Sequence, residues 1–134
     1  MELLFNADNF KKRLKTEFLD EKGNLYYWGI YDFSYKYRTR IYDKDSQEIY
    51  YVEKDIYDNN LVNLFDYKGN KVGEIIRKDG TCILNEYVFN GDIDDGKADN
   101  LFAIKDDRLT ILDDDKAELI ILFIFGLVEM KEGA

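Results

Sequence analysis

One stretch near the end of the sequence constrains the fold more than any other. Residues Ala117–Met130 read Ala-Glu-Leu-Ile-Ile-Leu-Phe-Ile-Phe-Gly-Leu-Val-Glu-Met, and no side chain from Leu119 to Val128 is polar. A membrane-spanning helix needs about 20 apolar residues, so this run is too short to cross a bilayer. Because an all-apolar run shows no periodicity, two structures remain open: a fully buried strand, or a helix enclosed by protein on every side.

The preceding chain carries a repeated hairpin pattern, which favours the enclosed helix. Each unit is a strand, a tight turn that begins with Asp, and a second strand. Glycine and asparagine in such turns adopt positive φ at low cost, and the leading Asp can bond the turn backbone. A spacing of roughly 22–25 residues predicts a meander of antiparallel strands. The three turns begin at Asp20, Asp43 and Asp66, between apolar strands at 14–19 and 25–30, 40–42 and 48–53, and 61–65 and 71–76.

Weaker patterns complete the chain. Turns are expected at 78–81 and 105–108, each between two strands, and the Asn-, Asp- and Gly-rich segment 90–100 reads as a loop. Asp113–Asp115 are placed to start a helix near Lys116, because acidic residues oppose its positive N-terminal dipole. From Glu129 and Met130 onward, the chain is expected to emerge into solvent.

Residues 1–13 fit two structures. Leu3, Leu4, Phe5, Phe10 and Leu14 suit a short amphipathic helix capped by Asp8 or Asn9, and a first strand fits almost equally well.

Length and residue types define the class of protein. Residues 1–134 are expected to form a single domain, and 20 Phe and Tyr residues exclude a disordered chain. The single Cys82 has no internal disulfide partner and lies in an apolar context, which predicts a buried, inert thiol. The N-terminus lacks a basic region followed by a long apolar region, so no signal peptide is predicted and a cytoplasmic location is expected.

The net charge of −9 lies entirely in the second part of the chain. Residues 1–54 hold ten basic and ten acidic residues, whereas residues 55–134 hold nine and eighteen. Nucleic acid is excluded as a partner, because binding depends on neutralising phosphates. Anionic lipid is disfavoured for the same reason, unless a local basic patch overrides the total.

The hairpin units and the final apolar helix resemble the tubby C-terminal-like superfamily. Within it, the chain is most similar to the small LURP-one-related proteins, whose barrel is like that of the phospholipid scramblases. The matching stretches are 18–27, 40–52, 64–76, 101–113 and 117–128. The resemblance implies a mainly β (α+β) fold, an antiparallel β-barrel closed around a C-terminal, buried hydrophobic helix.

The sequence departs from the family pattern in one place. The stretch between Arg77 and Leu101 is short for the full set of twelve family strands. We therefore expect a shortened barrel, trimmed or open on one side, with its edge covered by the N-terminal segment or by a second copy of the chain.

A basic strand is the best candidate binding surface. On a strand, alternate side chains share a face, so Lys36, Arg38 and Arg40 are expected to point the same way. Three cations on one face can hold a phosphate or an anionic lipid headgroup, and the resemblance to tubby domains implies phosphoinositide binding by basic residues on barrel strands. The alternative is an exposed face whose charges pair with Glu48, Glu53 or other acids across the strands.

Other constellations predict little chemistry. The segment from Asp92 to Asn100 is rich in oxygen ligands, but an EF-hand register fails, because Asp95 takes the glycine position and Leu101 the bidentate glutamate position. The sequence has no His, no Gly-rich phosphate loop, no nucleophile elbow and no metal-spaced Cys set. We therefore expect no cofactor, no metal and no enzyme activity.

Three functional hypotheses follow from these observations. The first is a non-catalytic binding or scaffolding module with a protein partner, present as a monomer or weak homodimer. The second is a peripheral membrane module that reads anionic phospholipid or phosphoinositide through Lys36, Arg38 and Arg40. The third is an enzyme with an unrecognised pocket.

Overall fold

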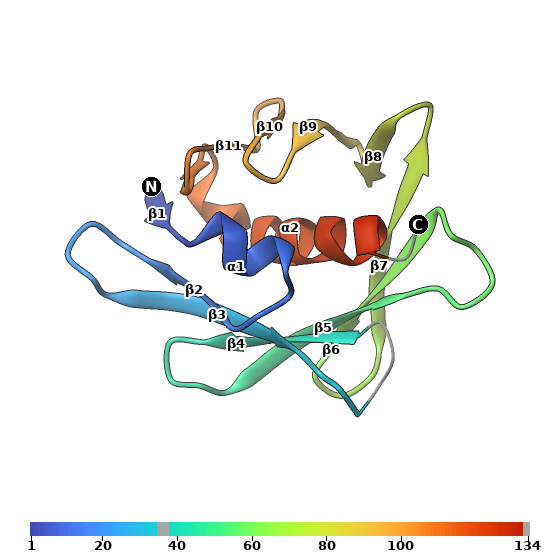
Figure 1. The fold of residues 1–134 in the computed structure, drawn as a ribbon, viewed down its shortest axis with the longest axis horizontal. Helices are drawn as coiled ribbons and strands as arrows, with labels where there is room; N and C mark the ends of the chain where they lie inside the picture. The colour runs from blue at the N-terminus through green and yellow to red at the C-terminus, as the bar shows by residue number, and fades with distance from the viewer. Residues whose placement is uncertain (35–37, 133–134) are drawn as a thin grey trace.

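The computed structural model describes residues 1–34 and 38–132, which form a closed antiparallel barrel around one long helix (Figure 1). The strands are β1 (Glu2–Leu4), β2 (Thr16–Leu19), β3 (Leu25–Tyr31), β4 (Arg38–Asp43), β5 (Glu48–Lys54), β6 (Leu61–Asp66), β7 (Lys71–Lys78), β8 (Thr81–Leu84), β9 (Tyr87–Asp92), β10 (Asp95–Ala98), β11 (Phe102–Lys105) and β12 (Arg108–Ile111). The helices are α1 (Ala7–Lys11) and α2 (Ala117–Glu132), and a short 3-10 turn, η1 (Asp114–Lys116), precedes α2.

The barrel closes fully, so the expectation of a trimmed or open barrel is wrong. Each strand pairs with its sequence neighbours, and β1 pairs with both β2 and β12. Some of the strands that seemed to be missing between Arg77 and Leu101 lie in residues 90–100. These residues were expected to form a loop, but β9 and β10 pair there as a hairpin. Two facing glycines permit this pairing, since a Cβ added at Gly91 would lie 2.6 Å from the Cα of Gly96. Glycine is typical of loops, but here Gly91 and Gly96 allow β9 and β10 to approach each other closely.

The three Asp-led turns have the predicted structure. In the first, a carboxylate oxygen of Asp20 accepts the backbone N–H groups of Lys22 and Asn24, each at 2.9 Å. Asp43 and Asp66 accept the corresponding pairs of N–H groups in their own turns. The side chain thereby satisfies backbone donors that the hairpin leaves unpaired, which fixes the register of the flanking strands.

Helix α2 is the interior of the barrel, as the apolar run indicates. Figure 1 shows it running between β2–β7 on one side and β8–β11 on the other. Glycines allow two close approaches: a Cβ at Gly126 would lie 2.3 Å from the Ile75 side chain, and one at Gly29 would lie 2.4 Å from the Phe125 ring. Within the described residues, no helix has the length and apolar content needed to cross a membrane.

The end of α2 corrects a second expectation. Glu129 and Met130 do not emerge into solvent: both are buried. The helix extends to the far end of the barrel, where Arg13 of the α1–β2 connection bonds Glu129 and Lys54 of β5 bonds the Met130 carbonyl. A prediction of burial from apolar residues alone therefore ends the buried segment too early.

The N-terminal segment contains both of the structures that the sequence left open. It makes the short strand β1 and then helix α1, whose N-cap is Asn6 instead of Asp8 or Asn9; the Asn6 side chain accepts the N–H of Asn9 at 3.0 Å. Phe5 and Phe10 pack with Phe18 and Phe125 in edge and stacked ring contacts. Helix α1 thus covers the apolar side chains of α2 at one end of the barrel.

The start of α2 is fixed by a cap and by a tyrosine. The Asp113 side chain accepts the N–H of Asp115, which confirms the predicted helix start. The Tyr50 hydroxyl, from β5, donates to Oε1 of Glu118 at 3.0 Å. Partial burial and the charge of Glu118 raise the pKa of Tyr50 to about 12.

This tyrosine predicts a specific loss of stability at alkaline pH. Because its folded pKa exceeds the unfolded value of about 10, the neutral hydroxyl stabilises the fold below pH ~10, and this contribution is lost as the pH approaches about 12. We expect Tyr50→Phe to cost about 1 kcal/mol near neutral pH. Urea unfolding of the wild type and of Tyr50→Phe should be measured along a pH series. The difference between their free energies of unfolding should shrink as the pH rises from ~10 to about 12. A difference that stays constant with pH would contradict the assignment.

Candidate functional site

The predicted basic surface is largely neutralised. Lys36 lies outside the described residues, while Arg38 and Arg40 point outward from β4 because Thr39 and Ile41 point inward and are buried. Arg38 pairs with Glu53 on β5. Arg40 bonds Asp32 at 2.6 Å and Glu48 at 2.7 Å. Pairing with Glu48 and Glu53, the alternative considered from the sequence, is therefore confirmed.

These pairs form a compact layer on the barrel surface. The guanidinium groups of Arg38 and Arg40 lie 4.2 and 5.6 Å from the centre of the Tyr51 ring. The hydrogen bond from Arg40 lowers the pKa of Asp32, which keeps this carboxylate charged. An anionic ligand would have to displace bound carboxylates here.

Inward-facing charges gather at the end of the barrel where α2 ends, which we call the mouth. The mouth is formed by the chain after β1, β3 and β5 and by the turns after β7, β9 and β11. The opposite end carries the Asp-led turns and the Asp113–Asp115 cap. Acidic residues occur at both ends, because the connections at the mouth also carry Asp55, Asp79 and Asp94. The mouth is distinguished by charged side chains that face inward.

The first group at the mouth is a buried ion pair. Glu129 on α2 is 0% exposed, and its two carboxylate oxygens accept from Nη2 of Arg13 at 3.0 and 2.9 Å. Thr39 donates its hydroxyl to the same carboxylate, and the Arg13 guanidinium lies 3.7 Å from the centre of the Tyr31 ring. This bidentate geometry ties the α1–β2 connection to the end of the central helix.

The second group is an inward-facing lysine. Lys54 occupies the position after Val52 that points into the barrel, and it is only 3% exposed. Its ammonium group donates to the carbonyl of Met130 at 2.9 Å, near the negative end of the α2 dipole. Burial, and after it the nearby charge of Arg77, lowers the pKa of Lys54.

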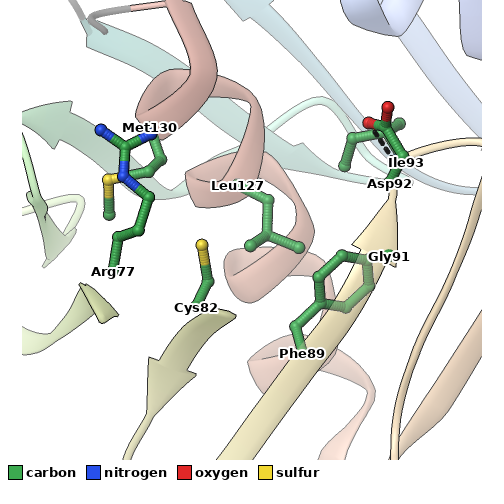
Figure 2. A pocket seen from close by; sticks show the side chains of 8 residues that line it. All are labelled: Arg77, Cys82, Phe89, Gly91, Asp92, Ile93, Leu127 and Met130. Atoms are coloured by element: carbon green, nitrogen blue, oxygen red, sulfur yellow. Dashed lines mark hydrogen bonds between the residues drawn. The ribbon is translucent and has the colours of Figure 1, made fainter. Parts of the chain in front are cut away.

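A cavity of about 220 Å³ lies beside this group, between α2 and strands β7–β9 (Figure 2). Figure 2 shows Arg77 at one end, Asp92 at the other, and Cys82, Phe89 and Leu127 between them. Its lining residues are Arg77, Cys82, Phe89, Gly91, Asp92, Ile93, Leu127 and Met130. Cys82 is partly buried against this space, which refines the expectation of a buried thiol, and burial raises its pKa.

Arg77 is a candidate binding residue that sequence reasoning did not select. Strand alternation could have found it: Ile75 points into the core, so Arg77, two residues later on β7, points inward as well. Its Nε donates to Oδ1 of Asn60 at 3.0 Å, and its Nη2 donates to the Asn59 carbonyl at 3.2 Å. Across the described part of the chain, neither Arg77 nor Lys54 forms a salt bridge with a carboxylate.

The Asp-rich segment does not assemble an ion site. Among the residues that the structure describes, no three acidic, His or Cys side chains are placed to hold a metal ion. Asp92 bonds the N–H of Ile93 at 2.8 Å, and Asp94 pairs with Lys11.

Comparisons with protein-family models, with curated proteins and with solved structures found no match for this chain.

Proposed function

We propose that the protein is a non-catalytic binding module whose protein partner docks on loops at the mouth of the barrel. The observation that carries this proposal is a set of exposed apolar side chains on two neighbouring connections. Phe33, between β3 and β4, is 86% exposed, and Ile56 and Tyr57, between β5 and β6, are 74% and 92% exposed. Pairing of Arg38 with Glu53 brings the start of β4 beside the end of β5, so the two connections are neighbours.

This arrangement suits protein recognition. Single exposed apolar residues are ordinary on protein surfaces, whereas a group of large ones on adjacent loops marks an interaction site. Phe and Tyr supply large contact areas at interfaces, with little rotamer entropy to lose.

A catalytic role receives little support from the cavity. A thiolate is the nucleophilic form of cysteine, and burial raises the pKa of Cys82, which keeps the thiol protonated. The nearest candidate for a catalytic pair, Glu129 with Arg13, is an ion pair engaged on both carboxylate oxygens.

The proposed relationship to the tubby C-terminal-like superfamily is supported by the closed barrel around a central helix, the arrangement that the resemblance implies. A monomer is supported by the same closure, because a closed barrel offers no free strand edge to a second copy. We propose a cytoplasmic location, to which one unpaired cysteine is suited.

Affinity capture with a matched pair of variants tests the docking proposal. The mouth variant is Phe33→Ser with Ile56→Ser and Tyr57→Ser; the control is Tyr67→Ser with Leu112→Ser, two exposed residues toward the opposite end of the barrel. We expect a partner captured by wild type and by the control to be reduced at least ~10-fold with the mouth variant, because buried aromatic anchors dominate interfaces. Equal capture by all three proteins would refute the docking site.

Anionic membrane binding is the second candidate function. It is favoured by the position of Arg38 at the start of β4, next in the fold to the connection that bears exposed Phe33. Sedimentation with phosphoinositide-containing vesicles at low salt tests it. Binding that is lost in an Arg38→Gln, Arg40→Gln variant would support a lipid surface, and no sedimentation of wild type would remove it.

A further inference from the structure

The cavity beside the second half of α2 combines an apolar interior with a cation, Arg77, whose hydrogen-bond partners in the described part of the chain are neutral. Its volume of about 220 Å³ exceeds the ~150 Å³ apolar cavity that suffices to bind benzene in another protein. It is smaller than the ~300–1,000 Å³ typical of drug-sized ligands. The space therefore suits a small molecule with a short hydrocarbon part.

The middle of the cavity carries no charge. Phe89, Ile93 and Leu127 present rings and branched alkyl groups, and they are buried members of the core. Cys82 and Met130 contribute sulfur atoms, which are polarizable and apolar in character when the thiol is protonated. A hydrocarbon chain placed here would exchange water for apolar contact, at about 25 cal/mol per Å².

The two ends of the cavity differ in charge. At one end, Arg77 donates to two neutral oxygens of Asn59 and Asn60, which leaves three of its five N–H donors for other acceptors. At the other end, Asp92 is engaged by the N–H of Ile93, and its charge acts on Lys11. An anionic group is therefore favoured at the Arg77 end and disfavoured at the Asp92 end.

Lys54 makes the Arg77 end more favourable for an anion. The C-terminal end of α2 carries partial negative charge, which would oppose an anion near Met130. The buried ammonium group of Lys54 already binds the Met130 carbonyl and offsets this charge. The positive charge of Arg77 also destabilises the charged form of Lys54, and a bound anion would relieve that repulsion.

We propose that this cavity binds a small amphipathic monoanion of the medium-chain carboxylate class, with its carboxylate on Arg77 and its alkyl chain against Leu127 and Phe89. None of the residues that line the cavity belongs to the docking loops, and only the hydrogen bonds from Arg77 to Asn59 and Asn60 reach the β5–β6 connection. The inference therefore does not depend on the proposed protein partner, and each can fail alone.

Calorimetric titration of the full chain with sodium octanoate, below its micelle-forming concentration, tests the proposal. Octanoate is expected to bind at least ~10-fold more tightly than octylammonium, because the cation would meet Arg77. Arg77→Gln should weaken octanoate binding at least ~10-fold, as expected when a charged hydrogen bond is lost. Lys78→Gln is the matched control: it removes the same charge from the next residue of β7, which is exposed on the outer face.

A second measurement uses the wild-type protein alone, so that it does not depend on the folding of a variant. Octanoate bound in the cavity should slow the reaction of the single thiol, Cys82, with a disulfide reagent, whereas octylammonium at equal concentration should not. The proposal is overturned if octanoate does not bind, if octylammonium binds as tightly, or if Lys78→Gln weakens binding as much as Arg77→Gln. Octanoate binding without protection of Cys82 would place the ligand elsewhere and would also overturn it.

Discussion

Replacing Glu129 by leucine is expected to lower the free energy of unfolding by about 3–5 kcal/mol. The carboxylate is fully buried at the end of α2 and accepts three hydrogen bonds from the guanidinium group of Arg13 and one from Thr39. Without it, the Arg13 charge remains in a mostly buried position and the Thr39 hydroxyl loses its acceptor. The cost therefore comes from the groups left without a partner, more than from the lost pair itself.

Urea unfolding followed by circular dichroism measures this effect, and two further variants separate its causes. Glu17→Leu changes the same side chain at an exposed position on β2 and should alter stability by no more than about 0.5 kcal/mol. Arg13→Met combined with Glu129→Leu should recover most of the loss, because no buried charge remains unpaired. A double variant as unstable as Glu129→Leu alone would show that the loss does not come from the stranded guanidinium group.

Replacing Phe123 by alanine should cost a similar amount, about 3–5 kcal/mol. Helix α2 lies closest to β5 and β6, and large side chains bridge the wider space to the opposite wall of the barrel. Phe123 is fully buried, and its ring packs edge-on against Phe102 on β11, with centroids 5.7 Å apart, and against Phe89 on β9. Truncation would leave an empty volume that a closed barrel cannot collapse to fill.

Phe33→Ala is the matched control for this variant, because it is the same substitution at a side chain that is 86% exposed. It should change stability by no more than about 0.5 kcal/mol. Equal losses for the two variants in urea unfolding would contradict the position of α2 as the filling of the barrel. A loss below about 1 kcal/mol for Phe123→Ala would indicate that β9 and β11 relax onto the helix.

In the candidate site, the alternation of side chains along a strand predicts the face on which a charged residue lies, but not its partner. Alternation along a strand correctly places Arg38 and Arg40 on one outer face, and the same rule places Arg77 and Lys54 inside. What alternation does not provide is the partner of each charge. Glu48 and Glu53 are cross-strand neighbours on β5, near in sequence, and were foreseeable from the hairpin. Glu129 is more than a hundred residues from Arg13, so their pairing depends on where the helix ends within the barrel.

The sequence by itself determined the hairpins and the enclosed helix of this protein. Asp-led turns and an apolar run without a polar face are local features, and their chemistry permits few structures. Only the tertiary structure decided that the barrel closes, that 90–100 is a hairpin, and that Glu129 is buried while the cavity beside Arg77 is open. These properties depend on distances between segments far apart in the chain, and residue types fix local conformation without fixing those distances.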